Sequence, residues 1–133
     1  MAKGNCPCGS KKLFGECCEP FLEYRAAAPT SLDLMRSRYT AFCRQNVDYL
    51  ARTHDPETRD AFDRAEAQAW SARARFTGLE ILKHSEEGDR GWVEFKASFR
   101  EDGHHYVHHE FSEFRRLDGR WYFRQGRDQE EHN

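Results

Sequence analysis

Four cysteines in the first eighteen residues constrain this chain more than any other feature of its sequence. They form two close pairs, Cys6 with Cys8 and Cys17 with Cys18, and eight residues separate the pairs. A thiolate is the soft, anionic ligand that Zn²⁺ prefers, and four thiolates complete a tetrahedral structural site. Because such a site leaves the metal no open position, the pattern predicts one structural zinc ion rather than a catalytic one.

The residues alone leave two other uses of these cysteines open. Either cysteine of the second pair could form a disulfide with Cys6 or Cys8, and the pairs could also form a redox site. The N-terminus lacks the apolar run of a secretory signal, so we expect a cytoplasmic protein whose thiols stay reduced. The Cys-x-x-Cys spacing of thioredoxin-like motifs is absent. Both observations favour the metal, and Cys43, which stands apart, is expected to be a small buried hydrophobic residue.

The charge balance argues against one broad class of function. The 133-residue chain has a formal net charge of −2, and four thiolates on one Zn²⁺ would add about −2 more. Nucleic-acid binding needs a basic face, so we expect no general affinity for nucleic acid. No apolar segment approaches the roughly 20 residues that cross a bilayer, so we expect no membrane span.

The first half of the chain carries helical patterns. Thr30 starts a capping-box-like sequence, and apolar residues at helical spacing predict a helix over 31–45. Asn46 is the expected cap of a short helix over 47–52. A run of good helix formers predicts a third helix over 59–74.

The second half changes to the period of two that is typical of strands. This alternation predicts strands over 75–84, 92–100, 104–117 and 120–125. The first two strands would be joined by a turn over 85–91, and the later ones by hairpin turns at Asp102-Gly103 and Asp118-Gly119.

Two irregularities are expected within these strands. Gly78 predicts a bulge or bend in the first strand. In the third strand, Val107, His109 and Phe111 are expected on the core face. Phe114 breaks their parity and predicts a bulge near Ser112.

Helices followed by strands predict an α+β fold, in which about three helices pack against a curved, mainly antiparallel four-stranded sheet. Such a sheet with a helix across it leaves a concave pocket. We expect residues 1–20 to form a small zinc module that docks, through Phe21, Leu22 and Tyr24, on a body over 21–133.

Two sets of residues resemble known families. Cys6-Pro7-Cys8-Gly9-Ser10 followed by Cys17-Cys18 resembles the SEC-C motif, a zinc knuckle also found at the C-terminal end of the SecA translocation ATPase. The stretches 34–42 and 119–123 resemble the YchJ-like family of uncharacterised bacterial proteins. The resemblance implies a nuclear-transport-factor-2-like (NTF2-like) fold, a cone-shaped α+β domain, with zinc bound by the four cysteines. It implies no established reaction.

Several polar residues are candidates for lining the concave pocket. His109 lies between two apolar positions of its strand, which predicts that its side chain points into the cone as a satisfied core histidine or as an acid–base group. A second metal site among the other histidines is not expected, because their spacing along the strand separates them. The candidate pocket residues are Arg36, Arg38, Tyr39, His54 and His109.

These observations support three hypotheses for function. In the first, which we favour, the protein is a non-catalytic adaptor whose knuckle binds a protein partner through Lys11 and Lys12, by analogy with the SecA knuckle and its chaperone and ribosome contacts. The alternative is a small-molecule-binding protein or an enzyme that uses the cone pocket. In the third, zinc only staples the N-terminus to a structural domain.

Overall fold

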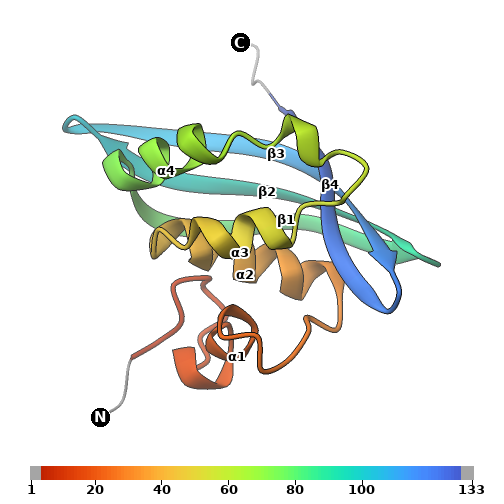
Figure 1. The fold of residues 1–133 in the computed structure, drawn as a ribbon. Helices are drawn as coiled ribbons and strands as arrows, with labels where there is room; N and C mark the ends of the chain where they lie inside the picture. Colours follow the sequence, from red (N-terminus) through yellow and green to blue (C-terminus); the bar gives the residue numbers. More distant parts are fainter. Residues whose placement is uncertain (1–3, 130–133) are drawn as a thin grey trace.

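The computed structural model describes residues 4–129, in which a long curved sheet carries the helices on its concave face (Figure 1). The helical segments in chain order are a 3-10 helix (Phe14–Glu16), α1 (Glu19–Leu22), α2 (Ser31–Cys43), α3 (Val47–Arg52), a second 3-10 helix (Arg59–Ala61) and α4 (Arg64–Arg73). The strands that follow are β1 (Arg75–Glu87), β2 (Arg90–Glu101), β3 (His104–Leu117) and β4 (Arg120–Asp128). The α+β fold with a four-stranded antiparallel sheet is therefore confirmed.

The sheet is an antiparallel meander in the order β1-β2-β3-β4. Asp102-Gly103 and Asp118-Gly119 form the predicted two-residue turns, and all four residues have positive φ, as type I′ hairpins require. The turn predicted over 85–91 is wrong in length. Ladder pairing from Ser85 with Trp92 onward reduces it to Gly88-Asp89.

Bulges interrupt two of the three strand pairings. The β1–β2 register shifts between Phe76 and Gly78, which confirms the bulge predicted at Gly78, and shifts again after Ile81. The β2–β3 pairing has no such shift, because its register is continuous from one end to the other. The β3–β4 register shifts between Glu113 and Phe114, which confirms an irregularity near Ser112, but the extra residue is Arg124 of β4 and not a residue of β3.

Local capping explains where the helices begin. The Thr30 side chain accepts a hydrogen bond from the backbone of Asp33, and Asn46 caps α3 in the same way, as predicted. The single helix predicted over 59–74 is wrong. Asp63 caps α4 by accepting from a backbone N–H, and the short polar side chain favours a helix start over a helix interior there.

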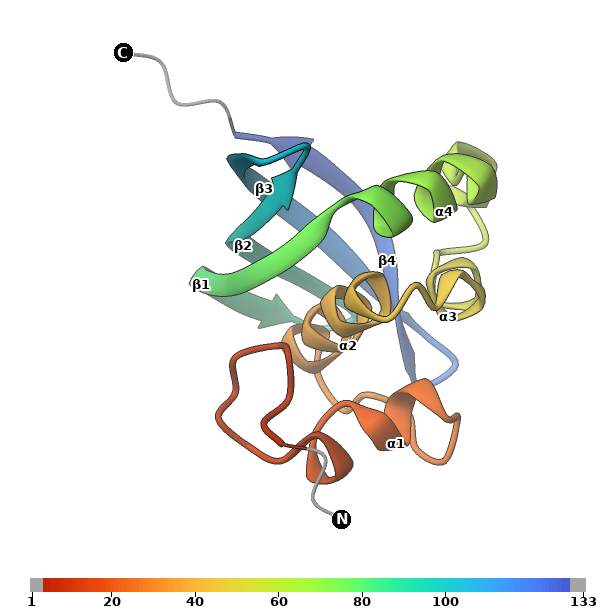
Figure 2. The same cartoon turned by 90° about the vertical axis from the view of Figure 1, so that its left-hand side faces the viewer.

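Helix α2 lies between the sheet and the cysteine segment (Figure 2). Leu22 is buried in the core and Phe21 packs against it, whereas Tyr24 is 51% exposed and its ring centroid lies 6.0 Å from that of Tyr49. The division at residue 20 stays a prediction, and that position falls inside α1. Within residues 4–129, none of the helices has the length and apolar character needed to cross a bilayer.

Candidate metal centre and adjoining pocket

The four predicted cysteines converge at one point in the structure. Their Sγ atoms all lie within 4.8 Å of one another, with Cys8 and Cys17 at 3.6 Å and Cys17 and Cys18 at 3.9 Å. A tetrahedral ion with bonds of about 2.3 Å to sulfur separates its ligands by about 3.8 Å. All four are free thiols, so the disulfide alternative is contradicted, and the cluster fits a tetrahedral metal ion.

Backbone hydrogen bonds hold the loop that carries these ligands. Gly9 and Lys11 adopt positive φ values of 80° and 71°, and the Cys6 N–H donates to the Lys12 carbonyl at 2.8 Å. These contacts close the loop after the first pair. We call residues 5–18 the knuckle.

Side chains outside the cluster tie the knuckle to α2. Arg36 donates from Nη1 to the carbonyl oxygen of Cys8 at 2.7 Å, and the Thr40 hydroxyl lies 3.7 Å from the Cys6 sulfur. Within the knuckle, Ser10 Oγ lies 3.1 Å from the Cys17 sulfur. Such contacts to metal ligands fix their orientation. Arg36 therefore serves the knuckle, and its predicted place in the pocket is wrong.

The thiols do not ionise independently. Hydrogen bonds from the Cys18 and Cys6 thiols hold the pKa of Cys8 far below its usual value, and hydrogen bonds with Cys6 and Cys8 raise the pKa of Cys18. Burial raises the pKa of Cys17 to about 11. Four thiolates in so small a volume repel one another, so a cation is needed for all four to be charged together.

The residues predicted to bind a partner lie on the outer side of this site. Lys11 and Lys12 are exposed, as is Leu13, with 44% of its surface accessible.

A pocket of about 430 Å³ lies between the helices and the concave face of the sheet. Of the predicted residues, Arg38, Tyr39 and His54 line it. His109 does not, because its Nε2 atom lies 2.7 Å from Glu94 on the other face of the sheet. We call this space the cone pocket; its lining residues are Met35, Arg38, Tyr39, Phe42, His54, Ala61, Phe62, Asp63, Glu66, Ala67, Trp70, Phe76, Phe95, Ala97, His108, Glu110, Ser112, Phe114 and Phe123.

Arg38 places a buried cation in the wall of the cone pocket. The residue is 8% exposed, and Nη1 donates to the Leu50 carbonyl at 2.9 Å and to the Thr53 hydroxyl at 2.6 Å. Its guanidinium carbon lies 4.7 Å from the centroid of the Phe123 ring. Burial lowers the pKa of Arg38 to about 10, so the side chain stays charged at neutral pH.

The buried ring of His54 lies in the same wall. It is 4% exposed, and within residues 4–129 neither ring nitrogen has a hydrogen-bond partner. The ring packs between Phe62 and Phe123, with centroids 5.6 and 5.3 Å away. Burial, followed by the charge of Arg38, lowers the pKa of His54. The imidazole is therefore neutral at physiological pH.

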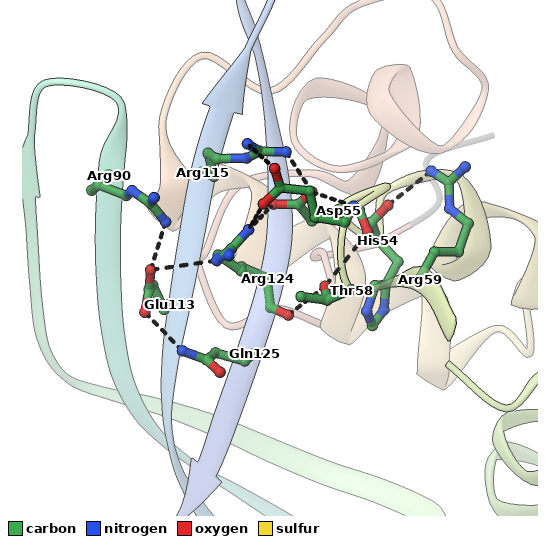
Figure 3. A network of polar contacts seen from close by, with 10 residues as sticks. His54, Asp55, Thr58, Arg59, Arg90, Glu113, Arg115, Arg124 and Gln125 are labelled. Atoms are coloured by element: carbon green, nitrogen blue, oxygen red, sulfur yellow. Dashed lines mark hydrogen bonds and ion pairs between the residues drawn. The ribbon is translucent and has the colours of Figure 1, made fainter. Parts of the chain in front are cut away.

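An ion-pair network beside His54 holds its backbone in place (Figure 3). Asp55 is fully buried and accepts from Arg115 at 2.6 Å and Arg124 at 3.1 Å. Burial alone would raise the pKa of Asp55, but hydrogen bonds from the Glu57 backbone and both arginines outweigh it and lower the pKa. The network joins the end of α3 to β3 and β4.

Sequence reasoning missed the polar residues that β3 directs into the cone pocket. His108 Nε2 lies 2.8 Å from Glu110 Oε1, and the Ser112 hydroxyl donates to the other Glu110 oxygen. Ser112 and Phe114 are buried on this face, and Val107 on the opposite face is 51% exposed. The even positions are the core face, so the parity assigned to Val107 and His109 is wrong.

Comparison with known proteins places this architecture in a family. The family model for the YchJ middle NTF2-like domain matches residues 30–126. The UPF0225 protein GSU1048 of Geobacter sulfurreducens is 44% identical over 124 residues, which cover 91% of this chain and 77% of the relative.

Two solved structures of SEC-C motif containing proteins are similar over nearly the whole chain. RPA3114 of Rhodopseudomonas palustris has a TM-score of 0.89 and 45% identity, covering 95% of this chain and 99% of its own. The Psychrobacter arcticus protein has a TM-score of 0.80 and 27% identity, covering 96% and 84% respectively. On this evidence the chain belongs to the YchJ family and combines its NTF2-like domain with an N-terminal four-cysteine SEC-C motif.

Proposed function

We propose that this protein binds a small organic molecule in the cone pocket and that one structural Zn²⁺ holds the knuckle against the same domain. The observation that carries the proposal is a pocket of about 430 Å³ whose wall contains the buried, charged Arg38. Pockets of a few hundred cubic ångströms with apolar walls and a few polar groups are typical of small-molecule sites.

The choice of zinc rests on the donor set. Four thiolates at tetrahedral spacing suit Zn²⁺, and they leave it no position for substrate. Since the site needs reduced thiols, we place the protein in the cytoplasm. The knuckle then has a structural role, because Arg36 and Thr40 connect it to α2.

A fluorescent probe tests the use of the cone pocket. N-phenyl-1-naphthylamine is neutral and apolar, and we expect it to bind the zinc-loaded protein saturably with one site per chain. Ala67 of α4 lines the pocket, so Ala67→Phe should fill the pocket and weaken binding about tenfold or more.

The matched control is Ala65→Phe on the exposed side of α4, which should bind as the wild type does. Near-ultraviolet circular dichroism of each variant excludes probe binding to a loosened core. Absence of saturable binding, or binding that Ala67→Phe leaves unchanged, would contradict the proposal.

Binding of a protein partner by the knuckle is a second candidate function. It is favoured by the exposed Lys11, Lys12 and Leu13 on the outer side of the knuckle. A rigid metal-bound loop with two cations fits an acidic segment of a protein partner. Affinity capture from a bacterial lysate should recover a partner that the Lys11→Glu/Lys12→Glu variant loses and that the Lys83→Glu control keeps. A partner retained by the knuckle variant would count against it.

A further inference from the structure

We infer that the ligand of the cone pocket is a flat apolar molecule with one carboxylate, and that Arg38 binds this carboxylate. The inference rests on the proposed binding function of the pocket and adds the chemical class of its ligand. It follows from the unused donors of Arg38, from the aromatic walls, and from the fact that no carboxylate within residues 4–129 forms an ion pair with Arg38.

Arg38 has hydrogen-bonding capacity that the protein does not use. A guanidinium carries five N–H groups. The Leu50 and Thr53 oxygens accept from Nη1 only. Among residues 4–129, neither Nε nor Nη2 of Arg38 donates a hydrogen bond. Three donors of a buried side chain are therefore left for a ligand.

None of the carboxylates within residues 4–129 forms an ion pair with Arg38. Glu110 is the acidic residue whose charge favours the Arg38 cation, but its two oxygens are bonded to His108 and Ser112. A buried charge without a direct partner is destabilising. An anionic group in the pocket would supply that partner.

The position of the guanidinium suits a planar acceptor. Arg38 lies over the Phe123 ring, and its two bonds through Nη1 fix its orientation. The Nε and Nη2 donors lie along one edge of a guanidinium and match the two oxygens of a carboxylate. A carboxylate can therefore bind with two parallel hydrogen bonds.

Aromatic side chains provide the remaining surface. Phe42, Trp70 and Phe76 form a cluster with ring centroids 5.2 to 6.1 Å apart, and Phe95 and Phe123 line the same pocket. Aromatic rings favour stacked or edge-to-face contacts with other flat rings. An apolar, planar ligand body therefore fits this lining.

His54 adds a neutral polar group near the same cation. The charge of Arg38 acts on its imidazole, and both ring nitrogens lack hydrogen-bond partners in the part of the chain that the structure describes. A neutral imidazole carries no charge that would compete with Arg38 for the anion. An organic cation would instead be repelled by Arg38, and a neutral ligand would leave the charge unpaired.

Three ligands of one shape test this inference on the zinc-loaded protein by isothermal titration calorimetry. They are 2-naphthoate, the neutral 2-naphthamide and the cationic 2-naphthylmethylammonium ion. We expect the carboxylate to bind about tenfold or more tightly than the amide, because charge-assisted bidentate hydrogen bonds are stronger than hydrogen bonds between neutral groups. The cation should bind more weakly than the amide.

Two variants assign the effect to Arg38. Arg38→Gln should reduce the preference for the carboxylate to about twofold or less. Arg64→Gln, which removes an equal charge from the exposed surface of α4, should keep the preference. Circular dichroism checks that Arg38→Gln folds. The comparison of the three ligands on the wild-type protein tests the carboxylate preference even if this variant does not fold.

The outcomes separate this inference from the proposed function. Equal binding of naphthoate and naphthamide would overturn the carboxylate inference and leave pocket binding standing. Failure of both to bind would overturn the proposed function as well. A preference that persists in Arg38→Gln and disappears in Arg64→Gln would assign the anion to another site and contradict the role of Arg38.

Discussion

Arg36 donates from its guanidinium to the carbonyl oxygen of Cys8 at 2.7 Å. This contact joins the middle of α2 to the loop that carries the first pair of metal ligands. A carbonyl held in this way fixes the backbone on either side of Cys8. The orientation of a metal ligand thus depends on a residue of the NTF2-like domain.

Replacing Arg36 with Gln should weaken both stability and metal retention while leaving all four ligands in place. Loss of a charged hydrogen bond costs about 1.5–3 kcal/mol, and loss of a residue that orients a ligand weakens metal affinity about 10- to 100-fold. Urea unfolding and zinc competition with a chromophoric chelator measure the two effects. The exposed Arg64→Gln variant is the control, and equal metal affinity in both variants would contradict the account.

Replacing Asp55 with Asn should destabilise the protein by about 3–5 kcal/mol, because the buried carboxylate is the shared partner of Arg115 and Arg124. Glu57 contacts the same arginines but is exposed, so Glu57→Gln should destabilise the protein far less than Asp55→Asn. Chemical denaturation at neutral pH compares the two. A similar loss of unfolding free energy in both variants would show that the burial of Asp55 does not determine its contribution to stability.

Replacing Gly91 with Ala should destabilise the contact between β2 and the start of α2. A Cβ atom at this position would lie 2.6 Å from Ser31 Cβ and also against the Ser31 hydroxyl. Overpacking of this kind costs about 1–3 kcal/mol. Gly78→Ala meets nothing within 4 Å and should cost about 0.5 kcal/mol or less. Thermal unfolding of the two variants measures the difference in stability. Equal stability would contradict this prediction and show that α2 moves aside without cost.

The ion pair of His108 and Glu110 should make stability depend on pH. Glu110 raises the pKa of His108 above its ordinary 6.5, so the histidine contribution is complete below pH 6.5 and is lost as pH rises through the raised pKa. Burial alone would raise the pKa of Glu110, but the hydrogen bond to His108 helps to hold this pKa below its ordinary 4.5. Its contribution is therefore present above pH 4.5 and is lost as pH falls through the lowered pKa.

A His108→Gln variant tests this dependence. The difference in unfolding free energy from wild type should be greatest between pH 4.5 and 6.5, at about 1 kcal/mol. It should be smaller at about pH 9. Urea unfolding at about pH 5.5 and about pH 9 provides the measurement. An equal difference at both values would show that His108 contributes by packing and not by charge.

The features that depended on local sequence were predictable. The Thr30 and Asn46 caps, the glycine-containing hairpin turns and the spacing of the cysteines each involve residues within about one turn or one loop. Counting apolar residues could not predict which face of β3 points to the core, because the core face carries His108, Glu110 and Ser112. These three side chains are accommodated there because they bond to one another, and such contacts appear only in the fold.

Long-range pairing limited the prediction of the site in the same way. Asp55 binds arginines 60 and 69 residues further along the chain, and no local pattern connects them. Arg36 and Arg38 both border an apolar helical stripe, so sequence could not decide which arginine faces the knuckle and which the pocket. The packing of α2 between two layers separates them.

Metal content by native mass spectrometry tests the central claim most directly. The wild-type protein should carry one zinc ion per chain, and Cys17→Ser should lose it, whereas Cys43→Ser should keep it because Cys43 lies outside the cluster. A metal-free wild-type chain of a mass that shows two disulfides, or a Cys17→Ser variant that retains zinc at full occupancy, would contradict the assignment of the four-cysteine centre.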